Sequence, residues 1–264
     1  MPAALRRSIL GVLAAIAITT AMDASGFSAF SALPLCLLLT LFWRVGRWSR
    51  DRMGFVWGRW RHYALAALYP VLVLGLLAGL SQAAGVVDLS ATNWERAWRN
   101  FALMTFSTVL IVVVTEEGYF RGWLWASLES AGLKLSHVVI ASSVAFALWH
   151  LSAVTLETGF NPPAAQIPVY MINAAVMGVI WGLLRGLSGS VFVASVSHGL
   201  WNGGAYAFFG FGSRVGALGI QDTTIYAPEV GLLGLALNVV FAATLWWCAV
   251  GRREARFSSD LRMQ

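Results

Sequence analysis

Glu116-Glu117-Gly118-Tyr119-Phe120-Arg121 is the stretch that decides the fold, because it directly follows an apolar run from Phe101 to Thr115. The apolar run is typical of a membrane-spanning helix. An ionisable side chain near the centre of such a helix costs about 2.5–3.5 kcal/mol, so three on one span cost on the order of 7–10 kcal/mol. A helix of this kind indicates that the charges have a use.

The composition of the chain supports a membrane protein. Of its 264 residues, 58% are hydrophobic and 11% are charged, whereas about 25% of residues are charged in globular domains. Segments able to cross about 30 Å of hydrocarbon recur along the chain. We predict an all-α, polytopic transmembrane helical bundle, with about eight membrane helices in a single integral membrane domain over residues 1–264. The predicted spans lie near residues 8–24, 27–43, 63–84, 101–123, 137–156, 168–184, 189–210 and 230–250.

The Lys and Arg residues predict the orientation of the bundle. If the N-terminus is cytoplasmic, three of the 18 lie outside (Arg96, Arg99 and Arg214), and Arg121 lies in the charged helix. The others fall in cytoplasmic loops, which by the positive-inside rule predicts that both termini are cytoplasmic. The net charge of +6 sits in short clusters beside membrane helices, so it indicates anionic lipid headgroups and not nucleic acid. The cytoplasmic set is Arg6, Arg7, Arg44, Arg47, Arg50, Arg52, Arg59, Arg61, Lys134, Arg185, Arg252, Arg253, Arg256 and Arg262.

Three further segments of the sequence need separate interpretation. Residues 1–25 resemble a signal peptide, with Arg6 and Arg7 ahead of an apolar stretch, but we expect them to be retained as the first span. The Arg-rich segment 44–61 fits either a helix lying on the membrane surface or a basic linker. Residues 211–229 are predicted to form a Gly-rich external loop.

Polar residues on three predicted helices are spaced one helical turn apart. Residues four apart share a helix face, and three such pairs occur: Glu117 and Arg121, Phe146 and His150, and His198 and Asn202. Because lipid offers no hydrogen-bond partners, these faces are expected to point into the bundle. We expect Glu116, His150, His198 and Asn202 to converge on one pocket.

This set of side chains suits hydrolysis of a peptide bond without a serine or cysteine nucleophile. A glutamate in an apolar site is able to take a proton from water and return it to the leaving amine. One histidine can orient the water, while a second histidine and an asparagine can donate hydrogen bonds to the oxyanion. We expect no cofactor, although a glutamate and two histidines are also able to hold zinc.

The sequence lacks the motifs of other kinds of intramembrane hydrolase. None of the four histidines begins or ends an H-E-x-x-H pair, which is the zincin layout. No serine lies in a G-x-S-x-G context. Asp23 is the only aspartate near a predicted span, so a mechanism with two aspartates has no second member.

The three motifs give the chain a resemblance to the CAAX prenyl protease 2 and bacteriocin-processing (CPBP, or ABI) family of intramembrane glutamate proteases. That family carries E-E-x-x-x-R, F-x-x-x-H and H-x-x-x-N on three helices, in the order found here within about residues 110–206. The resemblance implies that Glu116 activates water while Glu117 and Arg121 support and orient it. It also implies that His150 assists and that His198 and Asn202 form the oxyanion hole.

The expected function is endoproteolysis of a membrane-associated peptide or protein in the lipid bilayer, in a bacterial cytoplasmic (inner) membrane. Two alternatives remain open. In the first, the same cavity serves a non-catalytic scaffold or bacteriocin-immunity protein. In the second, the carboxylates relay protons in a coupled transporter, although the polar groups cluster at one place and no paired broken helices are evident. The sequence leaves the oligomeric state undetermined.

Overall fold

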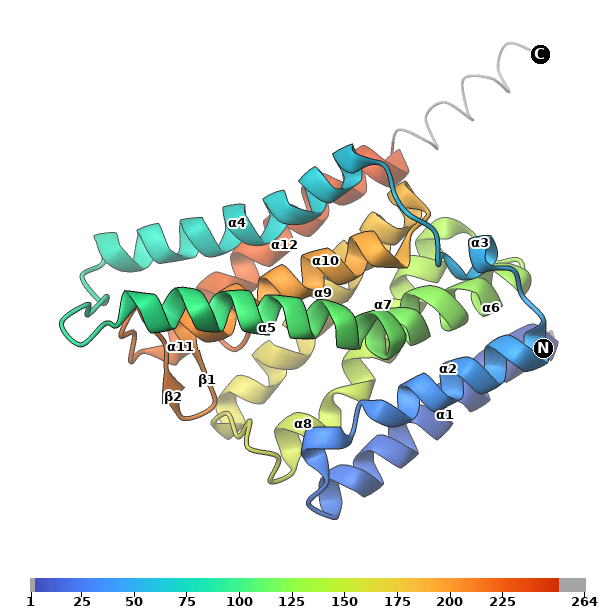
Figure 1. Cartoon of the computed structure of the whole chain (residues 1–264), viewed down its shortest axis with the longest axis horizontal. Coiled ribbons are helices and arrows are strands. Elements are labelled where there is room, and N and C mark those ends of the chain that lie inside the picture. Colours follow the sequence, from blue (N-terminus) through green and yellow to red (C-terminus); the bar gives the residue numbers. More distant parts are fainter. Residues whose placement is uncertain (1–2, 252–264) are drawn as a thin grey trace, which may run out of the picture.

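Helices account for most of the structure, a computed structural model that describes residues 3–251 (Figure 1). Two short strands, β1 (Gly210–Phe211) and β2 (Arg214–Val215), form an antiparallel hairpin in which Gly210 lies opposite Val215. The α-helices are α1 (Ala3–Ala24), α2 (Leu33–Gly46), α3 (Arg50–Met53), α4 (Trp60–Ala83), α5 (Trp94–Val114), α6 (Trp125–Ser130), α7 (Leu135–Trp149), α8 (Leu151–Thr155), α9 (Ile167–Ser188), α10 (Val191–Gly204), α11 (Thr223–Tyr226) and α12 (Leu232–Trp246). Shorter 3₁₀ and π-helical segments are η1 (Ser28–Phe30), η2 (Gly118–Leu124), η3 (Ala164–Gln166), η4 (Ala205–Phe209) and η5 (Trp247–Gly251).

Seven helical segments within residues 3–251 are long and apolar enough to cross a membrane. Large apolar side chains on their outer faces are exposed, among them Leu37 (74%), Val71 (68%) and Phe106 (67%), as expected for helices solvated by lipid. The chain is therefore an all-α integral membrane protein. The seven segments are Ala4–Ala24, Ser28–Gly46, Trp60–Ala83, Trp94–Ser130, Leu135–Thr155, Ala164–Ser188 and Leu232–Ala249.

The predicted span at 189–210 is the one that is not among these seven. Its residues form α10 and η4, but His198, Asn202 and several glycines make this segment more polar than the others. Figure 1 shows α10 in the middle of the bundle, and it contacts α4, α5 and α9. Because protein and not lipid surrounds α10, its polar side chains find partners that a lipid-facing helix would lack.

Two glycines allow α10 to lie directly against α5. A Cβ atom at Gly203 would collide with the Thr105 side chain and lie 3.0 Å from the Phe101 carbonyl oxygen. A Cβ atom at Gly199 would lie 2.9 Å from the Thr105 carbonyl oxygen. Small residues at such positions permit close approach of membrane helices, and this approach packs the helix that carries His198 and Asn202 directly against α5.

The first helix is bound into the bundle by three side-chain hydrogen bonds. The Ser8 hydroxyl donates to Ser127 of α6 at 2.7 Å, and the Trp149 indole of α7 donates to the Thr19 hydroxyl at 2.8 Å. Ser152 of α8 donates to Asp23 at 2.6 Å. In Figure 1, α1 and α2 lie side by side at one edge of the bundle, with α4 and α12 together at another.

The Arg-rich segment 44–61 is a linker and not a surface helix. Its middle part contains one helical turn, α3, between the ends of α2 and α4. Phe55 stacks on Trp43 at 4.8 Å and Trp57 on Phe192 at 4.6 Å, measured between ring centroids. Four arginines of the predicted cytoplasmic set lie outside the described residues, namely Arg252, Arg253, Arg256 and Arg262.

Candidate active site

The charged stretch lies at a break in its membrane helix. Helix α5 ends at Val114, and Thr115 departs from helical geometry with φ −111° and ψ −99°. From Gly118 to Leu124 the chain continues as π-helix η2, with every residue buried. Such π-helical turns are rare and occur mostly at functional sites. The break and the wide turn place Glu116, Glu117 and Arg121 beside α7, α9 and α10.

Glu117 and Arg121 form a fully buried ion pair. The distance from Arg121 Nε to Glu117 Oε2 is 3.4 Å, and both side chains are 0% exposed. Arg121 Nη2 also donates to the Gly178 carbonyl oxygen of α9 at 3.0 Å, and the guanidinium lies 4.4 Å from the Phe146 ring centroid. A buried charge needs such partners, so the pair fixes η2 against α7 and α9.

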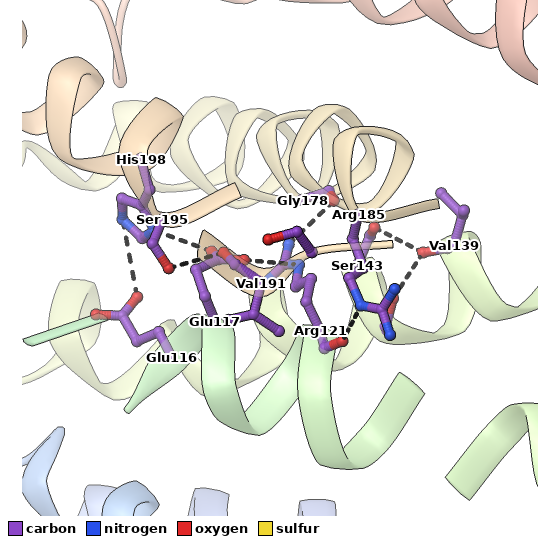
Figure 2. A network of polar contacts seen from close by, with 12 residues as sticks. Glu116, Glu117, Arg121, Val139, Ser143, Gly178, Arg185, Val191, Ser195 and His198 are labelled. Atoms are coloured by element: carbon purple, nitrogen blue, oxygen red, sulfur yellow. Dashed lines mark hydrogen bonds and ion pairs between the residues drawn. The ribbon is translucent and has the colours of Figure 1, made fainter. Parts of the chain in front are cut away.

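Arg185 extends this polar network to the next helical turn. Its Nε donates to the Arg121 carbonyl oxygen at 3.0 Å, as Figure 2 shows. Its Nη2 donates to the Arg52 carbonyl oxygen at 3.3 Å. Arg185 thereby satisfies main-chain acceptors of η2 and α3, and it stabilises the irregular backbone under the site.

His198 lies between the two glutamates. Its Nδ1 is 3.0 Å from Glu117 Oε1, and its Nε2 is 4.0 Å from Glu116 Oε2 (Figure 2). The imidazole stacks on the Trp181 ring with centroids 3.9 Å apart and an interplanar angle of 10°. Because Glu117 accepts from Nδ1 and Trp181 holds the ring plane, Nε2 is directed at Glu116.

His150 approaches Glu116 from α7. Its Nδ1 lies 2.9 Å from the Phe146 carbonyl oxygen, which is able only to accept, so this nitrogen carries a proton. Its Nε2 lies 3.8 Å from Glu116 Oε2. The Glu116 carboxylate therefore faces one ring nitrogen from each histidine.

The structure brings four of the six predicted residues into one pocket of about 180 Å³, here called the inner pocket. These are Glu116, His150, His198 and Asn202, whereas Glu117 and Arg121 lie beneath the pocket wall. The other lining residues are Phe146, Ala153, Phe160, Tyr170, Ala174, Met177, Trp181, Tyr206, Phe211 and Glu229. Within the described residues no group of three or more His, Cys, Asp or Glu side chains is arranged to hold a metal ion.

Glu229 is a site residue that sequence reasoning missed. It belongs to the segment between α11 and α12, outside the seven candidate spans, yet it is only 8% exposed. The Trp201 indole donates to its Oε1 at 3.1 Å. Burial raises the pKa of Glu229 from 4.5 to about 7, and the hydrogen bond from Trp201 opposes part of that rise. The available signal was an acidic residue in an otherwise apolar stretch, Ala227 to Gly234.

An outer cleft of about 230 Å³ adjoins the inner pocket. The two share Phe160, Tyr206, Phe211 and Glu229 as lining residues. The remainder of the outer cleft comes from residues 161–166, the β1–β2 hairpin and residues 220–230. The outer cleft and the inner pocket are therefore neighbours with Glu229 in the wall of both.

Comparison with known proteins gives one family match. Residues 98–204 match the family model described as type II CAAX prenyl endopeptidase Rce1-like. Over these residues the chain resembles that family. The match confirms the resemblance to the CPBP family, and it indicates a CAAX-protease-type hydrolase. No curated protein sequence matches the chain.

The Rce1-like segment covers α5 to α10 and contains all three motifs. The segment begins within α5 and ends at the last residue of α10, and these two helices pack against each other through Gly199 and Gly203. Glu229 lies beyond the segment. The match therefore includes the six predicted residues and leaves Glu229 as a feature of the flanking part of the chain.

Proposed function

We propose that this protein is an intramembrane endopeptidase in which Glu116 activates the hydrolytic water. The observation that carries the proposal is the position of the Glu116 carboxylate, which is 14% exposed and faces His150 and His198 in one pocket. A carboxylate in such a site is a suitable general base. Glu117, which is fully buried and paired with Arg121, has no such access.

The two histidines define where the water would bind. Separations of 3.8 and 4.0 Å between Glu116 Oε2 and the histidine Nε2 atoms exceed direct hydrogen bonds and suit water-mediated ones. Since Nδ1 of His150 donates to the Phe146 carbonyl oxygen, Nε2 of the neutral ring is an acceptor. A water between them can donate one proton to Glu116 and the other to His150, which directs its lone pair at a peptide carbonyl.

The chemical step then balances with these groups alone. Glu116 takes a proton as the water oxygen attacks the carbonyl carbon, and the carbonyl oxygen becomes an oxyanion. Asn202 and His198 supply hydrogen bonds to that oxyanion. Glu116 then returns the proton to the amine nitrogen, the carbon–nitrogen bond breaks, and a carboxylic acid and an amine leave.

The role of His198 depends on its protonation. With Nδ1–H donated to Glu117, Nε2 becomes a donor only in the imidazolium form. The Glu117 carboxylate fixes the ring of His198 through this contact, and Arg121 holds Glu117 in place. Glu117 and Arg121 are thus positioning residues that act through His198.

The substrate class follows from the surroundings of the site. We propose a membrane-associated peptide or protein, such as a peptide precursor, a signal-peptide remnant or a C-terminal sorting tag. The proposed location is a bacterial inner membrane with both termini in the cytoplasm. Under this orientation the outer cleft, formed by residues 160–166 and 205–230, opens on the external side.

The test compares cells that carry the wild-type chain, Glu116→Gln or Glu95→Gln, with protein levels matched. New peptide termini are read by mass spectrometry. Glu95 is an exposed carboxylate in the first turn of α5, so its replacement controls for loss of charge alone. Loss of a general base is expected to slow cleavage by at least about 100-fold.

Three outcomes separate the candidate functions. A product that is present with wild type and Glu95→Gln but absent with Glu116→Gln supports the protease. Products and phenotype that are the same in all three strains would contradict it and favour a scaffold or immunity role. Flux of a solute that depends on a pH gradient and on Glu116 would instead indicate transport.

A further inference from the structure

Glu229 lies where the outer cleft meets the inner pocket. It lines both, together with Phe160, Tyr206 and Phe211. The Phe160 and Phe211 rings stack with centroids 4.7 Å apart. A peptide reaching Glu116 through the cleft would pass a carboxylate bordered by aromatic rings.

A buried polar network holds the backbone of Glu229 in place. Asn173 of α9 donates from Nδ2 to the carbonyl oxygens of Pro228 and Glu229, at 2.9 and 3.0 Å. Asn238 of α12 donates to Asn173 Oδ1 at 2.9 Å, and the Tyr69 hydroxyl of α4 donates to Asn238 Oδ1 at 2.8 Å. Tyr69, Asn173 and Asn238 are 0% exposed. Three helices therefore fix this short loop segment.

Within the part of the chain that is described, no Lys or Arg side chain forms an ion pair with the carboxylate of Glu229. None of the ion pairs among the described residues includes Glu229. The titratable groups whose charge acts on it, or on which it acts, are Glu116, His198, Tyr69, Tyr170 and Tyr206. None of these is a permanent cation.

Burial of such a carboxylate is costly unless a cation or hydrogen bonds compensate for lost water. Hydrogen bonds with Trp201 and Tyr206 compensate in part. The pKa of Glu229, raised to about 7, reflects the part of the burial cost that is not compensated. The folded site therefore favours the neutral acid unless a cation binds next to it.

We propose that Glu229 forms a subsite that binds a positively charged group of the peptide substrate, either a Lys or Arg side chain or a free N-terminal ammonium. The apolar stem of a long basic side chain would pack along Phe160 and Phe211. The cation would bind the carboxylate in place of water. This inference rests on the proposed peptidase function, since it names what the same site selects.

The experiment measures peptide binding to the purified protein in detergent, in a Glu116→Gln background that binds without cleaving. Three fluorescent peptides of one sequence are compared: N-acetylated with a single Lys, N-acetylated with norleucine at that position, and with norleucine and a free N-terminus. The Lys is moved along the peptide in a series. Further variants add Glu229→Gln or Glu157→Gln. Glu157 is an exposed carboxylate outside both pockets, which makes it the matched control.

At least one cationic peptide is expected to bind at least about 10-fold more tightly than the acetylated norleucine peptide, the scale of one close charge pair. If the Lys peptide gains affinity, the subsite binds a basic side chain. If the peptide with the free N-terminus gains affinity, it binds an N-terminal ammonium. The preference should disappear with Glu229→Gln and persist with Glu157→Gln. Equal affinities for all three peptides, or a preference that survives Glu229→Gln, would overturn the proposal.

A second measurement needs no change at Glu229. In the Glu116→Gln background the ratio of affinities for the cationic and norleucine peptides should fall as pH drops from 7 to 5, because protonation neutralises the Glu229 carboxylate while the Lys side chain and the N-terminal ammonium stay charged. A ratio independent of pH would count against the subsite. Failure of the proposed function shows differently: wild type would bind cationic peptides in a Glu229-dependent way and cleave none of them.

Discussion

At the scale of single residues, a buried charge is stable only when it has a partner of opposite charge. Glu117 and Arg121 are both fully buried and lie 3.4 Å apart. Removing one member of such a pair leaves the other without compensation, which typically costs 3–5 kcal/mol. The pair therefore has a structural role that can be measured apart from catalysis.

Replacement of Arg121 by Met is expected to destabilise the protein by about 3–5 kcal/mol, because the buried Glu117 would lose its guanidinium partner and keep only the contact with His198. The double variant Glu117→Gln/Arg121→Met should recover at least half of that loss. Thermal unfolding in detergent measures both, with the exposed Arg96→Met as control. A double variant no more stable than the single would show that the ion pair is not the cause.

The stability of the protein is expected to depend on pH through Glu229. Its pKa rises from 4.5 to about 7 on folding because the side chain is buried, so the folded state retains a proton that the unfolded chain releases. This contribution to stability is fully present below about pH 4.5 and is lost as pH rises through about 7. Glu229→Gln should flatten the decline between pH 5 and 8 in thermal unfolding, whereas Glu157→Gln should leave it unchanged. A wild-type unfolding temperature that rises over this range would contradict the assignment.

At the scale of elements, the site depends on how closely α10 approaches α5. His198 and Asn202 lie on the helix that packs through Gly199 and Gly203. The glutamates lie just past the end of α5. A small separation of the two helices would move the proposed oxyanion donors away from the proposed base, since positioning errors of about 1 Å are costly in catalysis.

Gly203→Ala is expected to cost about 1–3 kcal/mol and to reduce peptide cleavage, because its Cβ would lie 3.0 Å from the Phe101 carbonyl oxygen. Gly75→Ala is the matched control. Gly75 is exposed within α4, and a Cβ atom there would have no neighbour within 4 Å, so the change should be neutral or stabilise the helix by up to about 1 kcal/mol. Unfolding and cleavage assays on both variants test this; equal effects would show that the close approach is unimportant.

At the scale of the whole molecule, the membrane sets the direction from which substrate arrives. Residues 160–166, the β1–β2 hairpin and residues 220–230 line the outer cleft. Figure 1 shows the hairpin and α11 near one another, away from α3 and the start of α1. The proposed orientation therefore puts the cleft and the linker before α4 on opposite faces of the bilayer.

Labelling of single cysteines tests this orientation. In a Cys36→Ala/Cys248→Ala background, Ser213→Cys in the hairpin should react with a membrane-impermeant maleimide in intact cells. Asp51→Cys in α3 should react only after permeabilisation. Both native side chains are exposed, so neither change should disturb packing. The reverse labelling pattern would invert the orientation and place the cleft on the cytoplasmic side.

The sequence by itself determined the helical membrane character, most of the spans and the three motifs. These features are local: apolar runs of sufficient length and polar residues one turn apart are properties of contiguous residues. Only the tertiary structure decided that α10 is enclosed by other helices and that His198 lies between Glu116 and Glu117.

Glu229 shows most clearly what the sequence alone does not reveal. From the sequence it is the last residue of a Gly-rich loop, because burial cannot be read from its neighbours in the chain. It is placed by Asn173 and Trp201, which lie 56 and 28 residues away. Contacts of that sequence separation form only when the helices assemble, and for this reason the fold and not the local pattern brings a further carboxylate to the site.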